Sequence, residues 1–330
     1  MAALVAAAPL SGVQKEQVRA FLRAQGLTFG DDAEYTALLY EGDAIVATGS
    51  LCGQVLKYIA VSELAQGEGA CAAIVSALVQ QASRWGRSHL FLYTKPGNKA
   101  LFSSLGFYAL VQTADILMME NRKLGLASYL ASLERGLPGT QGAVVANCNP
   151  FTLGHRYLME QAAGQVTALH VFVVSEDTSF FPAALRYEMV KKGTADIPNI
   201  CLHQSESYLV SAATFPTYFL KDGVKPELAQ ADLDIALFGA RIAPALGISL
   251  RFVGTEPFCE VTAQYNARLR EQLPGYGIAL RELPRKDNIS ASAVRAAIQA
   301  GDWERVRQLT LPQIYDDIRS FADANTGGAR

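Results

Sequence analysis

The sequence has few cysteines, little net charge and no long apolar run, and each absence excludes a class of protein. Its five cysteines are odd in number and scattered, without a CxxC pair, at Cys52, Cys71, Cys148, Cys201 and Cys259. That spacing argues against a disulfide framework and against a zinc site. No apolar run approaches the roughly 18 residues that cross a bilayer. The formal net charge of −2 gives no electrostatic reason to bind nucleic acid or an anionic membrane.

The first residues do not have the pattern of a signal peptide. Met1–Leu10 is apolar but short, and it lacks the basic residues that precede the apolar core of such a segment. Half of the 330 residues are hydrophobic, which is enough apolar surface for stable folding. A chain of this length is too long for one ordinary core. We therefore expect a cytoplasmic protein with two domains.

The expected domain boundary lies in a segment with several glycines and a proline, Glu134–Gly142. A buried strand is predicted directly after it, at Ala143–Ala146. The sequence thus predicts a first domain over residues 1–136 and a second domain over residues 137–330. It contains no convincing internal repeat.

The most informative segment follows that strand. Asn147–His155 is a tight polar turn with the sequence NCNPFTLGH, and it leads into a predicted helix at Tyr157–Ala163. Exposed backbone amides and the positive end of the helix dipole attract anions at such a point. Gly154 has no Cβ and lets the backbone approach a ligand closely, while His155 can donate to a phosphate oxygen. These residues alone fit both a nucleotide site and an ordinary capped loop.

A second segment, Asn288–Arg295, opens another predicted helix far along the chain. Ser290 is expected at the N-cap and Ser292 in the first turn. Arg295 lies about one and a half turns into this helix, from where its planar fork can reach phosphate oxygens beyond the helix end. An ordinary capped helix with a solvated arginine would have the same pattern.

Together the two segments resemble the nucleotidylyltransferase superfamily, whose signatures are (H/T)xGH and an ISSTxxR-like motif. The first stands here as Thr152-Leu153-Gly154-His155. The second stands as Ile289–Arg295, with Ala291 in place of one serine and Ser292 in place of the threonine. The resemblance implies catalytic roles for Thr152, His155 and Arg295. It implies nucleotide binding by their neighbours Asn147, Asn149, Pro150, Gly154, Ser290 and Ser292.

The region after the boundary alternates strands and helices, as a doubly wound parallel sheet does. Strands are predicted at Val166–Val174, Asn199–His203 and Leu250–Gly254, and a helix at Pro182–Thr194. We expect a Rossmann-like α/β fold in which Glu256 lies at the ligand-binding edge of the sheet. Glu256 could bind a ribose or a cation there, or be an ordinary surface residue. His170 and His203 lie in apolar strands and are interpreted as structural.

The first domain shows a different pattern. Strands are predicted at Tyr35–Tyr40, Ala44–Leu51, Val55–Val61 and His89–Thr94, with His89 in the core, and a long helix after Gln66–Ala70. The turn QGEGA and the segment FSSLGF at Phe102–Phe107 resemble the GCN5-related acetyltransferase fold, a mixed sheet whose Q/RxxGxG/A loop binds pyrophosphate. The resemblance implies ligand binding by Gln66, Gly67 and Gly69. Cys71 and Phe102 depart from the pattern, and Phe102 lacks the hydroxyl of the usual tyrosine, a candidate proton donor. We therefore expect the fold without independent acetyl transfer from coenzyme A.

An acetyltransferase-like domain before an (H/T)xGH domain resembles the citrate (pro-3S)-lyase ligase family. The stretches that carry this resemblance are Ala146–Gln161, Ala213–Lys221 and Phe252–Asn266. The family's activity implies that ATP and acetate acetylate a thiol of the citrate lyase acyl carrier subunit, on its phosphoribosyl-dephospho-coenzyme A arm. AMP and pyrophosphate are released, and acetyl-adenylate is the implied intermediate. Mg²⁺ is expected to screen the triphosphate.

Some members of the superfamily use a lysine in the loop after the second strand, and this loop, Ser175–Phe181, has none. Arg186 and Lys191 are candidate substitutes. Two other functions stay open: an adenylyltransferase that acts on a phosphate ester, such as a coenzyme A or dinucleotide precursor, and a non-catalytic carrier-binding regulator. The first leaves the N-terminal domain unexplained. The intact Thr152–His155 motif argues against the second.

Overall fold

The computed structural model describes residues 3–67, 69–175, 179–209, 215–220, 225–257, 259–286 and 289–326. Of the residues singled out above, the following lie outside this set: Met1, Ala2, Glu68, Glu176, Asp177, Thr178, Ala213, Thr214, Lys221, Phe258 and Asn288. Within the described set, no helix is both long and apolar enough to cross a membrane.

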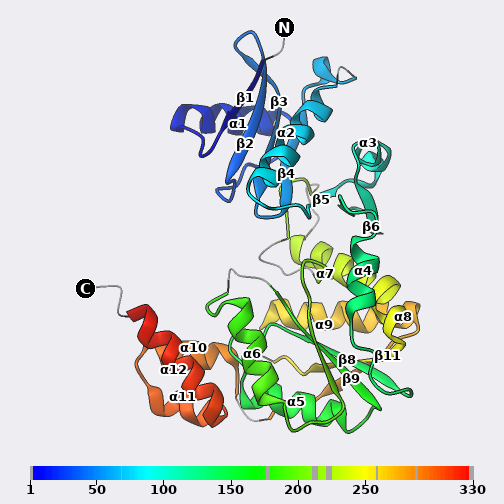
Figure 1. The fold of residues 1–330 in the computed structure, drawn as a ribbon, viewed down its shortest axis with the longest axis vertical. Coiled ribbons are helices and arrows are strands. Elements are labelled where there is room, and N and C mark those ends of the chain that lie inside the picture. The colour runs from blue at the N-terminus through cyan, green and yellow to red at the C-terminus, as the bar shows by residue number, and fades with distance from the viewer. Residues whose placement is uncertain are drawn as a thin grey trace. The chain divides into compact units, whose positions relative to one another are not determined.

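The chain forms two compact units (Figure 1). The first unit comprises Met1–Tyr129 and Pro216–Ala229, and the second comprises Leu130–Phe215 and Gln230–Arg330. The division at residue 136 into separate domains remains a prediction. The first unit also takes in a segment from far along the chain, since the rings of Tyr218 and Tyr58 lie 4.7 Å apart. No local signal in the sequence marks that segment.

The first unit is built on a seven-stranded mixed sheet. Its strands are β1 (Ala3–Ala7), β2 (Tyr35–Glu41), β3 (Ala44–Cys52), β4 (Val55–Val61), β5 (Phe91–Thr94), β6 (Tyr108–Gln112) and β7 (Leu117–Glu120). Their order is β1-β2-β3-β4-β5-β7-β6, and only β4 and β5 run parallel. The helices are α1 (Gly12–Ala24), η1 (Glu63–Ala65), α2 (Ala70–Arg84), η2 (Pro96–Asn98) and α3 (Lys99–Ser104), and α4 (Gly125–Ser132) begins in this unit and ends in the second.

Alternation along the strands buries both faces of this sheet. In β2, Leu39 packs in one cluster with Ile74 of α2, while its neighbour Leu38 packs in another with Leu22 of α1. Gly49 of β3 lets α2 come close, because a Cβ there would lie 2.6 Å from Cγ2 of Ile74. The mixed sheet between α1 and α2 is the architecture expected for the first domain.

The second unit contains a five-stranded parallel sheet in the order β10-β9-β8-β11-β12. Its strands are β8 (Gln141–Ala146), β9 (Ala168–Val173), β10 (Ile200–Gln204), β11 (Ile248–Gly254) and β12 (Ala279–Leu283). Helices before β11 are α5 (Leu153–Ala163), α6 (Ala183–Gly193), α7 (Pro226–Leu237), which begins in the first unit, the π-helix η3 (Phe238–Ile242) and α8 (Ala243–Leu246). Those after it are α9 (Glu260–Gln272), η4 (Leu273–Tyr276), α10 (Ala291–Gln299), α11 (Trp303–Leu309) and α12 (Pro312–Thr326).

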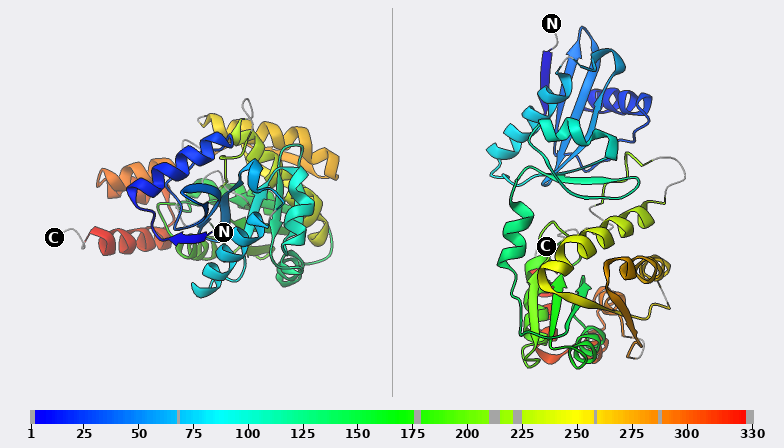
Figure 2. Two further views of the ribbon diagram at one scale, coloured as in Figure 1. Left: turned by 90° about the horizontal axis from the view of Figure 1, so that it is seen from above. Right: turned by 90° about the vertical axis from the view of Figure 1, so that its right-hand side faces the viewer.

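Helices cover both faces of the parallel sheet (Figure 2). On one face, Val171 and Val173 of β9 join a core with residues of α5, α6, α10, α11 and α12. On the other face, Phe172 meets the ring of Phe238 edge-on at 6.2 Å. Every residue of β9 is buried as a result, which explains why this strand appears in the sequence as a continuous apolar run. The doubly wound α/β fold is confirmed.

The predicted strands and helices are confirmed to within a few residues, with one error. His89 precedes β5 instead of lying in it, because the amide of Leu90 donates to the side chain of Asn121, 2.8 Å away, and not to a strand partner. The His89 ring contacts Glu120 across 2.6 Å. His170 and His203 are buried and hydrogen-bonded to each other at 2.9 Å, as expected of structural residues.

Candidate active site

A cavity of about 510 Å³ lies at the carboxyl ends of β8 and β11 in the second unit. The chain leaves β8 for β9 on one side and reaches β11 on the other, so the strand order reverses here, where open α/β sheets bind ligands. The volume suits a ligand of nucleotide size. Every site residue predicted for this unit lines the cavity except Pro150, which is buried in the loop behind it: Asn147, Asn149, Thr152, Gly154, His155, Glu256, Ser290, Ser292 and Arg295.

Thr152 caps the helix α5 that points into the cavity. Its side-chain oxygen accepts from the backbone amide of His155 at 3.3 Å, and its own amide donates to Nδ1 of His155 at 3.1 Å. The hydroxyl of Thr152 also lies 3.0 Å from that Nδ1. This reciprocal capping box satisfies two helix-end donors and orients the imidazole ring.

The capping box also fixes the tautomer of His155. A nitrogen that accepts a hydrogen bond from a backbone amide carries no proton, so the proton of the neutral ring is on Nε2. Burial, together with the positive charge of Arg285, lowers the pKa of His155 to about 4. The ring stacks on Phe151, with centroids 5.9 Å apart and planes 19° apart. His155 is therefore a neutral, oriented donor at ordinary pH.

Arg186 supports the loop between β8 and α5 from behind. Its guanidinium is fully buried and donates to the backbone oxygen and to Oδ1 of Asn147, at 2.8 and 2.6 Å, and to the carbonyl of Phe181. Asn149 holds the same region, since its Oδ1 accepts from the amide of Phe181 at 3.0 Å. Asn147 and Asn149 thus shape the loop, and Arg186 acts as a structural support.

The second motif forms the N-terminus of α10. The Ser290 side chain accepts from the amide of Ala293 at 3.0 Å, which confirms the expected N-cap. Arg295 donates to the carbonyl of Asn149 at 2.5 Å and to the hydroxyl of Ser292 at 3.0 Å. Arg295 therefore joins the two motifs, which lie 146 residues apart in the sequence.

Gly154 lets the two motifs come close together, and it also leaves room for a ligand at the backbone. A Cβ at this position would lie 3.2 Å from the backbone oxygen of Ile289, just before α10. A side chain here would require a shift of a few tenths of an ångström between the two segments. From the sequence, we expected Gly154 to let a ligand approach the backbone closely. The structure adds a second reason, which is the close approach of the second motif to the same backbone.

Sequence reasoning missed three cationic residues of the cavity, Arg251, Arg285 and Lys286. Arg285 donates to the carbonyl of Thr255 at 2.9 Å and forms an ion pair with Glu256. Lys286 is exposed, and its ammonium lies 5.9 Å from the ring centre of Tyr157. For Arg285 and Lys286, the signal in the sequence was a pair of basic residues shortly before the ISSTxxR-like motif. The carboxylate of Glu256 therefore pairs with Arg285 and also accepts a hydrogen bond of 3.1 Å from the backbone amide of Cys259.

Some members of the superfamily have a lysine in the loop after β9, and this chain has none there. The positions of the basic residues show which of them could take its place. Glu176, Asp177 and Thr178 of that loop lie outside the described residues. Of the candidate substitutes, Arg186 is occupied by the loop, and Lys191 is 64% exposed and lies 3.8 Å from Glu188. Neither lines the cavity, whereas Lys286 does. Among the described residues, no three His, Cys, Asp or Glu side chains cluster as metal ligands.

The first unit has its own candidate site. Gly67 and Gly69 both have positive φ, 85° and 79°, just before α2, and a Cβ on either would meet no atom within 4 Å. Gln66 precedes them in extended backbone. A separate cavity of about 200 Å³ lies between β4 and β5, which pair only at Val55–Phe91 and Leu56–Leu92. Phe102, Tyr218 and Phe219 also line it.

The doubly wound sheet, with both motifs at one cavity, is the arrangement expected of the nucleotidylyltransferase superfamily. Residues 141–316 match the family model described as the citrate lyase ligase C-terminal domain. The chain is 39% identical to a [citrate [pro-3S]-lyase] ligase of Klebsiella pneumoniae over 94% of each chain, and 38% identical to one of Escherichia coli K12 over 89% of this chain and 87% of that one. It therefore belongs to the citrate lyase ligase family.

Solved structures also include proteins similar to part of the chain. Escherichia coli ElaA aligns with 37% of this chain and 100% of its own, at 16% identity and a TM-score of 0.34.

Proposed function

We propose that this protein uses ATP and acetate to acetylate the thiol on the prosthetic arm of the citrate lyase acyl carrier subunit. The relatives at 38–39% identity are named as ligases of citrate lyase. One observation carries the proposal for the site: the Thr152–His155 and Ser290–Arg295 motifs converge on one cavity through the 2.5 Å hydrogen bond from Arg295 to Asn149.

In the first step, a carboxylate oxygen of acetate attacks the α-phosphorus of ATP. The new P–O bond gives acetyl-adenylate, and pyrophosphate leaves with the electrons of the broken bond. The protein supplies charge stabilisation and positioning, without a protein nucleophile. Nε2–H of His155 donates to a phosphate oxygen, and Arg295 and Lys286 bring positive charge to the same cavity. The helices α5 and α10 add backbone donors at their N-termini.

Mg²⁺ would neutralise part of the triphosphate charge in this step. Glu256 is the carboxylate that lines the cavity, and it is engaged by Arg285. We therefore expect the phosphate oxygens and water to provide most of the ligands of the ion, which is how Mg²⁺ is usually bound with nucleotides.

In the second step, the carrier thiolate attacks the carbonyl carbon of acetyl-adenylate. A thioester forms, AMP leaves, and the thiol proton passes to solvent or to AMP. The neutral His155 holds no proton at Nδ1 and is fixed by Thr152, so its role is to stabilise the phosphate of the leaving AMP.

The first unit would bind the prosthetic arm of the carrier. The arm contains a pyrophosphate, and Gly67 and Gly69 offer open backbone at the start of the 15-residue helix α2. The cavity between β4 and β5 has room for a narrow chain. This docking role also explains why Phe102 can replace a tyrosine, because no proton has to be donated to a thiolate there.

The test is acetylation of purified carrier subunit with its prosthetic arm. Incubation with the protein, ATP and acetate should add one acetyl group per arm thiol and release AMP and pyrophosphate in equal amounts. A carrier whose thiol is already alkylated should remain unmodified. Release of ADP and phosphate in place of AMP and pyrophosphate would overturn the proposal.

A further inference from the structure

Arg251 is a buried cation that has no role in the two reaction steps proposed above. It lies on β11, between Ala143 of β8 and Leu280 of β12, and its side chain is 2% exposed. Among the described residues, its Nε and Nη1 have no hydrogen-bond partner, and both are shielded from solvent. Buried polar groups are nearly always paired, and an unpaired guanidinium is especially costly. Such a group needs an explanation.

The surroundings of Arg251 hold the guanidinium without satisfying it. Its central carbon lies 4.5 Å from the ring centre of Phe238, so one face is covered by an aromatic ring. Asp234, on α7, accepts a 2.5 Å hydrogen bond from the hydroxyl of Tyr265, on α9. Burial lowers the pKa of Arg251, while the charges of Tyr265 and Asp234 act to raise it. The nearby carboxylate of Asp234 is thus bonded to Tyr265.

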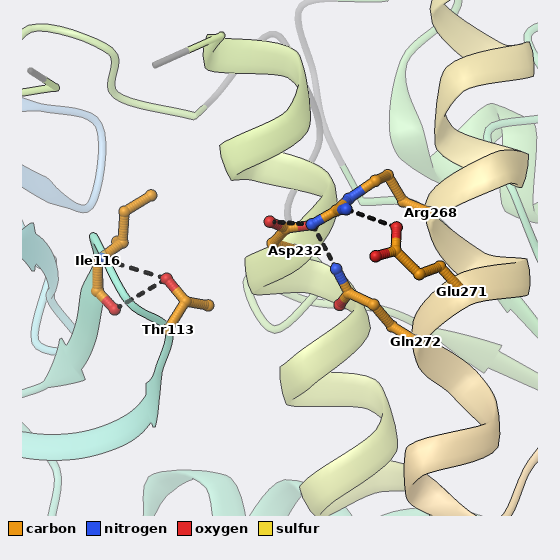
Figure 3. Close-up of polar contacts among 6 residues, drawn as sticks. All are labelled: Thr113, Ile116, Asp232, Arg268, Glu271 and Gln272. Atoms are coloured by element: carbon orange, nitrogen blue, oxygen red, sulfur yellow. Dashed lines mark hydrogen bonds and ion pairs between the residues drawn. The ribbon is translucent and has the colours of Figure 1, made fainter. Parts of the chain in front are cut away.

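A polar network joins α7 and α9, the helices that carry Asp234 and Tyr265, and Figure 3 shows it. Arg268 of α9 forms a two-pronged pair with Asp232 of α7, at 2.7 and 2.6 Å, and Gln272 adds a bond of 2.6 Å to the same carboxylate. Asp232 lies two residues before Asp234 on α7, and Arg268 lies three residues after Tyr265 on α9. The network therefore ties together the two helices that bring Asp234 and Tyr265 near Arg251.

Arg251 lines the same cavity as His155 and Arg295. Two residues further along β11, Val253 also lines it, and Tyr265 and Asn266 contribute from α9. The cavity therefore has two polar parts: the helix N-termini with the motif residues, and the buried arginine on the strand. A guanidinium fork matches a carboxylate in geometry and charge. The cavity of about 510 Å³ also has to hold the nucleotide, which leaves room for a small acid beside it.

We propose that Arg251 binds the carboxylate of acetate beside the nucleotide and thereby determines that the acyl substrate is a small carboxylate. This inference rests on the proposed function, because it needs acetate as the second substrate. A carboxylate in the cavity gives the guanidinium an acceptor, while the ring of Phe238 covers one of its faces. Arg251 is then a binding residue for the acid, separate from the phosphate-binding residues.

The test compares Arg251→Gln and Arg251→Lys in acetate-dependent exchange of labelled pyrophosphate into ATP. Loss of a charge-assisted hydrogen bond should raise the KM for acetate by about 10- to 100-fold in Arg251→Gln. Arg251→Lys keeps the charge without the fork and should give a smaller rise. The KM for ATP should change less than threefold in both. Arg270→Gln is the matched control, since Arg270 is an exposed arginine of α9 that pairs with Glu282 outside the cavity.

Three results would overturn this role. An unchanged KM for acetate in a folded variant would make Arg251 structural. A rise confined to the KM for ATP would make it a phosphate ligand. A loss of thermal stability with normal kinetics in the fraction that remains folded would make it a charge partner of Asp234. Titration with a non-hydrolysable ATP analogue identifies the folded variants, and Arg251→Lys serves if Arg251→Gln does not fold. Wild-type protein without any acetate dependence would refute the proposed function itself, which separates the two failures.

Discussion

The backbone amide of Thr152 donates to Nδ1 of His155 across 3.1 Å, within the first turn of α5. This contact leaves the proton of the neutral imidazole on Nε2 and directs the other edge of the ring to the cavity. Because the Thr152 hydroxyl lies 3.0 Å from the same nitrogen, the ring has little freedom to turn. In this chain the (H/T)xGH signature thus corresponds to a capping box, in which the threonine orients the histidine ring.

The first prediction concerns His155. If its Nε2–H stabilises phosphate charge in the transition state, His155→Ala should lower turnover by roughly 10²–10³-fold. His155→Gln keeps a side-chain amide donor of similar reach and should lose less. Both variants should fold, because the ring is half-buried at the cavity wall and not in the core. Near-normal turnover in a folded His155→Ala protein would contradict the assigned role.

The second prediction concerns Thr152, which is 1% exposed. Thr152→Ala removes the helix cap and one contact to His155, so we expect a loss of about 0.5–2 kcal/mol in unfolding free energy together with slower turnover. Thr152→Ser keeps the hydroxyl and should stay close to wild type in both. Urea unfolding and steady-state kinetics on the same samples measure the two effects. Equal behaviour of the two variants would show that the hydroxyl is not involved.

The third prediction concerns pH and the buried pair His170–His203. Burial lowers the pKa of His170 to about 4 and that of His203 to about 3, and the charge of His170 contributes to the latter. In the unfolded chain both titrate near 6.5, so below that pH the unfolded state binds more protons than the folded state. Stability is therefore full above pH 6.5 and falls as the pH drops towards about 4, by at most about 1.4 kcal/mol per pH unit for each histidine.

His203→Gln removes one titrating group and should flatten this pH dependence. The measurement is urea unfolding at pH 7 and pH 5.5, followed by the fluorescence of Trp303 in the second unit. A Trp85→Phe background removes the other tryptophan of the chain, which lies in the first unit. Equal slopes in the variant and its parent would refute the role of the pair.

The fourth prediction concerns the turn before α2. Gly69→Asp would place a negative charge where the pyrophosphate of the prosthetic arm approaches, and we expect acetylation of the carrier to fall by about 10-fold or more. Gly69→Asn is the matched control, because it carries the same strain at a φ of 79° without the charge. Acetate-dependent pyrophosphate exchange should remain intact in both.

Three other outcomes of this comparison are informative. Equal loss of exchange and carrier acetylation would give the first unit a structural or allosteric role. No loss of either would mean that the arm binds elsewhere. Equal loss of carrier acetylation in the Asn and Asp variants would point to backbone strain and not to charge.

The elements that could be predicted from the sequence are those encoded by a short stretch of neighbouring residues. The apolar run of β9 predicted a strand covered on both faces, and Ser290 predicted the start of α10; both are confirmed. The two motifs were expected to act together because of a resemblance, and the structure brings them to one cavity through Arg295 and Asn149. In each case a short segment contained the information.

What the sequence could not supply depends on contacts between distant segments. Arg186 was a candidate for phosphate binding, yet its donors hold Asn147 and Phe181. Arg251 gave no signal at all, since an arginine in a predicted strand is usually at the surface. Tyr218 packs on Tyr58 across 160 residues. Each of these depends on which elements become neighbours, and hydrophobic periodicity does not encode that.

The central claim is that the second unit makes acetyl-adenylate before any carrier is involved. The most direct test is exchange of labelled pyrophosphate into ATP with the protein alone, with and without acetate. We predict exchange that requires acetate and proceeds in the absence of carrier, and that is lost in His155→Ala. Exchange that ignores acetate and requires 4′-phosphopantetheine would contradict the account and identify an adenylyltransferase that acts on a phosphate ester.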